Sequence, residues 1–232
     1  MHIRKLAVLD APVELAELAR LYEFPAGVTV RTNFVATIDG GATGSNGLSG
    51  SINNAADKLV YDLNRRLCQV VLVGARTADA EGYRPAGPGA PPIVAASNHG
   101  QLPSAWAQPE QGGGAILVVP ESIAAAPLAR AVEALGEEQV WRIGRDRVDL
   151  AELVARMAAR GWARILCEGG PSLHAALLAE GLVGQVALSW VPSLVGGPGP
   201  RIVDGGALDV TLSRRHLLDI DGTLLGLWDI QR

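Results

Sequence analysis

The sequence contains few cysteines, and this shortage excludes several classes of protein. Cys68 and Cys167 are the only cysteines, too few for a disulfide framework or a cysteine-based zinc site. Both adjoin apolar stretches, so we expect them in the core. The formal net charge is -4, which gives no basic field for a nucleic-acid partner.

Long apolar runs are also missing. No run approaches the roughly 20 residues of a membrane-spanning helix. The start, MHIRKLAVLDAPVE, meets an acid and a proline too early for a secretory signal. We therefore expect a cytoplasmic protein without a membrane partner. With 48% hydrophobic and 19% charged residues in a chain of 232, there is ample material for a globular core.

Short apolar segments alternate with amphipathic ones, which predicts one α/β domain over residues 1–232 with a mostly parallel sheet. We expect strands at 28–38, 69–73, 93–96, 116–119, 140–143, 164–167 and 185–191. We expect helices at 13–22, 123–135 and 150–160, one capped by Asn54 that carries Leu59, Leu63 and Leu67, and one from Pro171 to Gly181. Asp221-Gly222 between two apolar runs predicts an antiparallel hairpin at the C-terminus.

The stretch ILCEGGPSLHAALLAEGLV, residues 165–183, places an acid, two glycines and a proline between a strand and a helix. Backbone N–H groups at such a helix start favour an anion, typically a phosphate. Gly169 and Gly170 allow close approach, Pro171 suits the first helical position, and Ser172 adds a hydroxyl. For two glycines alone, an ordinary tight turn is the better interpretation, and the common G-x-G-x-x-G fingerprint is missing.

Other polar residues also follow predicted strands. Asp39 ends the first long strand, where an acid can relay a proton to a bound heterocycle, although turn aspartates are commoner. Gly74 and Thr77 follow the next strand and either face the same crevice or form a plain loop. Arg65 is near a helix C-terminus and either holds a substrate phosphate or is a solvated dipole partner.

The histidines suggest no metal site. His2, His99 and His216 are scattered without metal-ligand spacing or a nucleophile motif. His174 is expected on the first turn of the helix after Pro171, near a ligand rather than acting as a base.

Three segments together, NFVATIDGGA, LVGARTADAEGYRP and CEGGPSLHAALLAEGLV, resemble the riboflavin-pathway pyrimidine reductase family. This family is the reductase half of a bifunctional deaminase-reductase and also occurs as a stand-alone protein. The resemblance covers nearly the whole chain. Residues 1–27, with DAPVELAELARLYEFPAG, are similar to the leader of stand-alone actinobacterial-type members, expected to pack on the domain. No His-x-Glu and Pro-Cys motif of the deaminase half is present.

The resemblance implies a three-layer α-β-α fold like that of dihydrofolate reductase, a homodimer, and NADPH as hydride donor. It implies a 5-phosphoribosylamino-pyrimidine substrate whose ribose is reduced to ribitol. The residues it places at the substrate are Asp39, Ser49, Arg65 and Glu168, with Asp39 and Glu168 as the candidate catalytic acids. Those it places at the cofactor are Ala36, Gly74, Thr77, Glu81, Gly169, Gly170, Pro171, Ser172, Leu173 and His174, with Ser97 and Asn98 as weaker candidates for the 2′-phosphate or adenine end.

The sequence departs from the family pattern at several positions. Thr37 replaces the usual serine, Glu81 an aspartate, and Gly184 the aspartate of G-L-V-D. The arginine of a D-P-x-L-T-x-R stretch has no aligned equivalent, because Arg84 is out of register. The group that binds the substrate phosphate is therefore open, and with it the identity of the substrate.

Two other functions compete with this hypothesis. One is a dihydrofolate or other pteridine reductase on the same scaffold, since an acid at Asp39 suits a pterin as well as a pyrimidine. The other is a nucleotide-binding protein without catalysis. Comparing the turnover of dihydrofolate with that of the ribosylaminopyrimidine phosphate distinguishes a pteridine reductase from a pyrimidine reductase. Cofactor binding without NADPH oxidation would identify a binding protein without catalysis.

Overall fold

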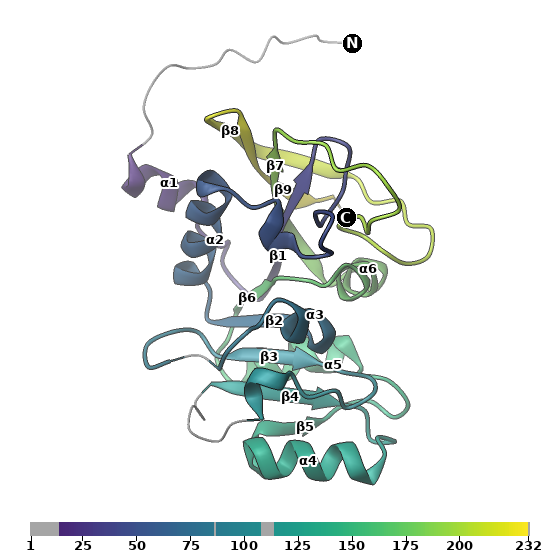
Figure 1. Ribbon diagram of the computed structural model, residues 1–232. Helices are drawn as coiled ribbons and strands as arrows, with labels where there is room; N and C mark the ends of the chain where they lie inside the picture. The colour runs from purple at the N-terminus through teal and green to yellow at the C-terminus, as the bar shows by residue number, and fades with distance from the viewer. Residues whose placement is uncertain (1–13, 86, 108–113, 232) are drawn as a thin grey trace.

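The computed structural model describes residues 14–85, 87–107 and 114–231, and within these residues nine strands form one sheet between two layers of helices (Figure 1). The sheet order is β5-β4-β3-β2-β6-β1-β7-β9-β8. The strands are β1 Thr29–Thr37, β2 Val70–Gly74, β3 Ile93–Ala96, β4 Ala115–Val119, β5 Val140–Arg142, β6 Arg164–Cys167, β7 Val183–Val191, β8 Leu212–Ile220 and β9 Thr223–Ile230.

The pairing of the strands confirms the predicted fold class. The strands from β5 to β7 in the sheet order pair in parallel. Strand β9 pairs antiparallel with β7 and β8. Asp221 and Gly222, both with positive φ, make the tight turn between β8 and β9, as the hairpin prediction required. Strand β6 lies between β1 and β2 although it comes late in the chain.

The side chains of the strands alternate between two cores, because successive residues point to opposite faces. In β2, Val70 and Leu72 belong to one core, whereas Val71 and Val73 belong to the other. All four are fully buried, which explains the continuous apolar run. Helices α5 and α6 cover the first face, and helices α3 and α4 cover the second. The helices are α1 Leu15–Leu21, α2 Ala55–Leu67, α3 Ala75–Ala80, α4 Ala125–Leu135, α5 Leu150–Ala159 and α6 Pro171–Ala179.

The helix boundaries follow local chemistry. The side chain of Asn54 accepts a hydrogen bond from the N–H of Asp57 at 3.1 Å and caps α2 as predicted. Pro171 begins α6, where its missing N–H costs nothing. Gly161 and Gly181 follow α5 and α6 with positive φ, so both end their helices as expected.

Several element boundaries differ from the predictions by one or two residues, and helix α3 was not predicted. Helix α3 follows β2 directly at residues interpreted as a possible loop, since it has only six residues and no apolar stripe to reveal it. Helix α4 begins at Ala125 rather than Ile123, and β7 begins at Val183 rather than Gln185. Helix α1 begins at Leu15, whereas Val13, where we expected its start, lies outside the described residues.

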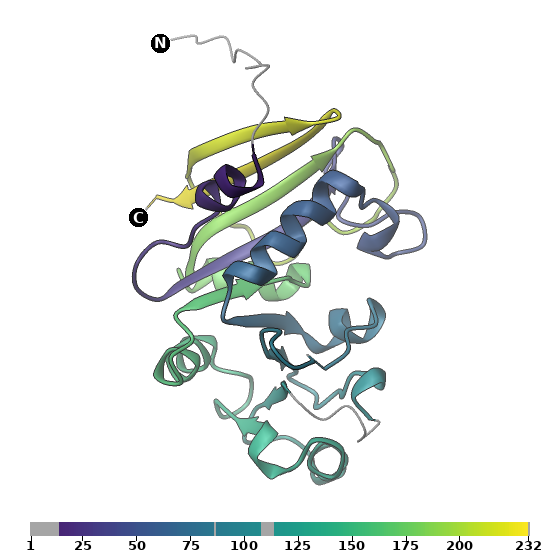
Figure 2. The same cartoon turned by 90° about the vertical axis from the view of Figure 1, so that its left-hand side faces the viewer.

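The described part of the amino-terminal leader packs on the sheet beside the C-terminal hairpin (Figure 2). Leu18 and Tyr22 of this segment share a buried cluster with Leu63 of α2 and Leu227 of β9. The backbone carbonyl of Tyr22 also accepts a hydrogen bond from the fully buried Arg31 at 2.6 Å. Residues 1–13 of the predicted leader lie outside the described residues.

Both cysteines are buried and free, as expected of core residues. Across the described ranges, no helix combines the length and the apolar character needed to cross a bilayer.

Candidate active site

The carboxyl ends of β1, β2, β3 and β6 open into one cavity with a volume of about 690 Å³. This is where parallel sheets commonly bind ligands. Residues of α2 and the loop before it, of α3 and of the start of α6 line the cavity. Of the predicted site residues, those that line it are Ser49, Gly74, Thr77, Glu81, Ser97, Asn98, Glu168, Gly170, Pro171, Ser172 and Leu173.

The turn between β6 and α6 is built from glycines because side chains of α3 and β1 lie too close for a Cβ. The N–H of Gly74 donates to the carbonyl of Gly169 at 2.7 Å. A Cβ on Gly170 would collide with the Thr77 hydroxyl, and one on Gly169 would lie 3.0 Å from the Phe34 ring. The Gly169–Gly170 peptide is cis. The turn therefore presents bare backbone to the cavity.

Helix α6 begins at this turn without a side-chain cap. Its first N–H groups have no partner within the helix, and Gly170, Pro171 and Ser172 line the cavity. Free N–H donors at a helix start suit an anionic group. The start of α6 therefore offers the N–H donors that the predicted anion site needs, and the site itself stays a prediction.

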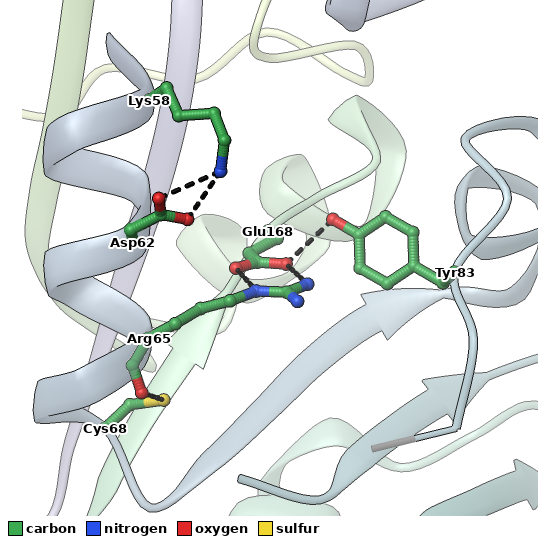
Figure 3. A network of polar contacts seen from close by, with 6 residues as sticks. All are labelled: Lys58, Asp62, Arg65, Cys68, Tyr83 and Glu168. Atoms are coloured by element: carbon green, nitrogen blue, oxygen red, sulfur yellow. Dashed lines mark hydrogen bonds and ion pairs between the residues drawn. The ribbon is translucent and has the colours of Figure 1, made fainter. Parts of the chain in front are cut away.

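Glu168 lies directly after β6 at the base of the cavity, and its carboxylate is held on two sides (Figure 3). The Arg65 guanidinium donates to both oxygens, with Nε–Oε1 at 2.8 Å and Nη2–Oε2 at 2.7 Å. The Tyr83 hydroxyl donates to Oε2 at 2.7 Å. The Glu168 side chain is only 2% exposed. This cluster holds the Glu168 carboxyl group in a fixed position.

The groups around Glu168 keep their protonation states as a result. Burial alone would lower the pKa of Arg65, but its hydrogen bonds and ion pair with Glu168 outweigh this effect and raise it. Burial and then the charge of Glu168 raise the pKa values of Tyr61 and Tyr83 well above the usual range. Both phenols are therefore neutral donors. The Arg65 guanidinium also lies 4.6 Å from the centre of the Tyr61 ring, a cation–π contact.

A hydrogen bond across the cavity joins two predicted residues. The Glu81 carboxylate accepts from the backbone N–H of Ser49 at 2.7 Å. This bond ties the loop before α2 to the end of α3. On the far side, the Ser97 hydroxyl accepts from Gln101 N–H, and the Asn98 amide oxygen accepts from Val148 N–H, each at 2.8 Å. Both side chains thus also hold the loops around the cavity.

The structure does not bring Asp39 to the cavity, which corrects the expectation that it faces the substrate. Its carboxylate accepts from Gly196 N–H at 2.7 Å and from the Thr37 hydroxyl. These bonds, with the Thr37 bond strongest, lower the pKa of the exposed Asp39 carboxyl. Asp39 therefore anchors the loop after β7 to the end of β1.

His174 and Ala36, both expected at the cofactor, also lie outside the cavity lining. His174 is 1% exposed, stacks on Phe34 at 4.6 Å, and contacts the carbonyl of Ile202 through Nδ1 at 2.9 Å. Since a carbonyl only accepts, Nδ1 carries the proton, and Nε2 accepts from the Thr32 hydroxyl. Burial lowers the pKa of His174, although the Ile202 bond opposes this. Ala36 is buried in an apolar cluster with Phe34.

Two further predicted residues act from behind the lining. The guanidinium of Arg65 binds the Glu168 carboxylate, and the carbonyl of Gly169 accepts a hydrogen bond from the N–H of Gly74. Arg84 is exposed and does not line the cavity either; the arginines that do are Arg76 and Arg147.

Several cavity residues were not predicted from the sequence: Asn33, Asp57, Tyr61, Tyr83 and Arg147. Asp57, Tyr61 and Arg65 follow one another at intervals of four on α2, which places them on one face of the helix. That spacing was available in the sequence. Tyr83 and Arg147 lie in loops, where no periodicity identifies them.

Residues 28–225 match the model of the RibD C-terminal domain family. This chain belongs to that family. It is 32% identical over 188 residues to the 2,5-diamino-6-ribosylamino-4(3H)-pyrimidinone 5′-phosphate reductase of Methanothermobacter thermautotrophicus, covering 76% of this chain and 84% of that protein. The resemblance to riboflavin-pathway pyrimidine reductases noted from the sequence is thereby confirmed.

Solved structures of the RibD type share the fold. A pyrimidine reductase-like protein from Corynebacterium diphtheriae superposes with a TM-score of 0.77 at 19% identity, covering 88% of this chain and 92% of that one. The diaminohydroxyphosphoribosylaminopyrimidine deaminase/5-amino-6-(5-phosphoribosylamino)uracil reductase of Thermotoga maritima superposes with a TM-score of 0.64 at 17% identity, covering 88% of this chain and 57% of that one. At these identities the likeness concerns the fold.

Proposed function

We propose that this RibD-family protein is an NADPH-dependent reductase that converts the ribosyl group of a 5-phosphoribosylamino-pyrimidine into a ribityl group. The observation that carries the proposal is that one cavity holds both the uncapped start of α6 and the Arg65–Glu168–Tyr83 cluster. The first suits a dinucleotide diphosphate. The second is a rigid polar group of the kind that orients a small substrate.

The cavity fits a dinucleotide on two counts. Its volume of about 690 Å³ is within the range of ligand pockets, roughly 300–1,000 Å³. The backbone at Gly170, where a Cβ has no room, allows a phosphate to approach the N–H groups. The residues that would hold the cofactor are Gly74, Thr77, Gly170, Pro171, Ser172 and Leu173.

The far end of the cavity is assigned to the adenine ribose. Ser97 and Asn98 follow β3 there, and Arg147 lines the same cavity from the loop before α5. A guanidinium suits a 2′-phosphate. This arrangement supports NADPH over NADH.

When bound, the nicotinamide would supply a hydride to the ribosyl carbon C1′, while the C1′–O4′ bond of the sugar ring opens and the released oxygen takes up a proton. The residues of the chain bind and orient the substrate. Glu168, held in place by Arg65 and Tyr83, accepts hydrogen bonds from the substrate and fixes its position. Tyr61, a neutral phenol on the cavity wall, is a donor toward the same region. The hydrogen bond between Ser49 and Glu81 holds the loop before α2 to the end of α3 at the cavity wall.

The assembly and location follow the family resemblance. We propose a cytoplasmic homodimer in which residues 1–232 form one reductase domain. Sedimentation equilibrium of the purified chain measures the oligomeric state.

The deciding experiment follows NADPH oxidation at 340 nm with three substrates: the 2,5-diamino-pyrimidinone ribosyl phosphate, the 5-amino-uracil ribosyl phosphate and dihydrofolate. Turnover of a pyrimidine, with mass spectrometry showing a ribityl product, is the expected result. Oxidation with dihydrofolate alone would replace the proposal by pteridine reduction. Binding of NADPH without turnover of any of the three would indicate a binding protein.

A further inference from the structure

Asp57 is a buried carboxyl group in the cavity that the proposed chemistry leaves unused. It lies on the first turn of α2, is 3% exposed and lines the cavity. In the part of the chain that the structure describes, no cationic side chain forms an ion pair with it; Lys58, next in sequence, binds Asp62 at 2.8 Å instead. A buried acid without a cation is costly unless a ligand supplies donors.

The surroundings of Asp57 confirm that its environment opposes charge. Burial raises the pKa of its carboxyl, and a hydrogen bond from Ser189 and the charge of Lys58 only partly offset this. Ser189 comes from β7 at the position opposite Val35 of β1. Asn33, two residues before Val35 and so on the same face of β1, also lines the cavity. Asp57 thus belongs to a polar floor beneath the substrate end.

Helix α2 sets the distance between Asp57 and the Glu168 cluster. Asp57 precedes Arg65 by eight residues, which corresponds to roughly 12 Å along the helix axis. Tyr61 lies between them on the same face, and Arg65 holds Glu168. A molecule placed beside Tyr61 therefore has one carboxyl group at each end, a fit for a heterocycle joined to a sugar.

The related reductases indicate which groups such a ring presents. The Methanothermobacter protein is named for a 2,5-diamino-4(3H)-pyrimidinone, whose N3–H and 2-amino group are adjacent donors. The Thermotoga protein is named for a 5-amino-uracil, whose N3–H adjoins a 2-carbonyl acceptor. A carboxylate offers two acceptors and matches the first edge, whereas an amide or a protonated carboxyl offers one donor and one acceptor and matches the second.

We propose that Asp57 binds the N3 and position-2 edge of the pyrimidine and gives this protein a preference for the 2-amino ring over the 2-oxo ring. The proposal rests on the proposed function, since it assumes that a pyrimidine occupies this cavity. Adjacent ring donors satisfy the carboxylate that the protein itself leaves without a cation.

The test measures binding rather than turnover, by isothermal titration calorimetry with two ring probes that lack the sugar phosphate. The probes are 2,5,6-triaminopyrimidin-4(3H)-one and 5,6-diaminouracil, titrated into the wild type, Asp57→Asn and the control Asp62→Asn. Asp62 is on the same helix but pairs with Lys58 at the surface. Asparagine preserves the shape of aspartate, and thermal unfolding verifies that each variant is folded.

We expect the wild type to bind the triamino ring more tightly. Asp57→Asn should weaken that binding roughly ten- to a hundredfold, the size of a lost charged hydrogen-bond pair, while binding of the uracil probe stays equal or tightens. Asp62→Asn should resemble the wild type. Equal preference for both probes in the wild type, or an unchanged ratio in Asp57→Asn, would overturn the proposal.

The failure of this inference is distinguishable from failure of the proposed function. A ring preference that depends on Asp57, in a protein that never oxidises NADPH, leaves the inference standing and removes the reductase. Turnover of a pyrimidine with the same probe ratio in the wild type and Asp57→Asn does the reverse.

Discussion

The guanidinium of Arg65 and the carboxylate of Glu168 meet in a two-point ion pair although 103 positions separate them in the chain. The pair joins the end of α2 to the end of β6, two elements that border the cavity. A planar guanidinium matches both oxygens of a carboxylate at once. The contact therefore fixes the orientation of the Glu168 side chain.

Replacing Arg65 with methionine should leave Glu168 buried without a cation. Loss of one partner of a buried pair costs about 3–5 kcal/mol; because the Arg65 side chain retains 29% exposure, we expect a loss near the lower end of that range. Urea unfolding measures it. The neighbouring exposed Arg66→Met is the control and should change the free energy of unfolding little. Equal stability of the two variants would show that the pair contributes nothing to the fold.

Gly170→Ala should abolish or strongly weaken NADPH binding. A Cβ there collides with the Thr77 hydroxyl, so the turn must shift and its N–H groups move away from the diphosphate. Fluorescence titration with NADPH gives the dissociation constant. Gly87→Ala, where a Cβ meets nothing within 4 Å, is the matched control. Wild-type affinity in Gly170→Ala would place the diphosphate elsewhere.

His216 should make stability depend on pH in mildly acid solution. Burial, then the charges of Arg31 and Arg215, lower its pKa from 6.5 to about 4. At a pH between these two pKa values, His216 binds a proton in the unfolded chain but not in the folded chain. The free energy of unfolding should therefore fall as the pH drops from 6.5 toward 4. Unfolding by urea across this range measures the slope.

The variant His216→Phe isolates this contribution, because the new ring retains contact with Tyr22, whose ring centre lies 4.7 Å from that of His216. Its pH dependence over the same interval should be shallower than that of the wild type. Identical slopes would assign the acid sensitivity to other groups.

Asp39→Asn should leave turnover close to that of the wild type. The carboxylate faces Gly196 and Thr37 rather than the cavity, so its loss affects the loop after β7. Steady-state NADPH oxidation with the accepted pyrimidine gives kcat and KM, and thermal unfolding reports the weakened loop. A large drop in kcat with unchanged KM would return Asp39 to the chemistry.

Much of the fold was predictable because its determinants are local. The run at β2, the cap at Asn54 and the Asp221-Gly222 turn each occupy a few neighbouring residues, and all three appear where expected. Helix α3 was not predicted from the sequence because its six residues form no apolar stripe and so give no periodic pattern.

The candidate site was predictable only where sequence and strand ends coincide. Glu168 and the glycines after it follow directly from a strand that ends at the sheet edge. Asp57 resembles an ordinary first-turn acid of a helix, and Tyr83 lies in a loop, so only tertiary packing brings them to the cavity. Asp39 follows a strand end and was therefore expected at the cavity. Its carboxylate instead accepts hydrogen bonds from the N–H groups of Val195 and Gly196, which lie 156 and 157 positions later in the chain.

The position of β6 has a consequence for synthesis on the ribosome. Strands β1 and β2 are complete by Gly74, yet the strand that separates them begins at Arg164. Until that segment emerges, β1 and β2 have no strand between them with which both can pair. Pairing β6 with strands so far away in the chain closes a long loop, which costs conformational entropy and slows folding. Nascent chains arrested before this point should therefore be sensitive to protease, and protection should arise abruptly once residues 164–167 have left the exit tunnel.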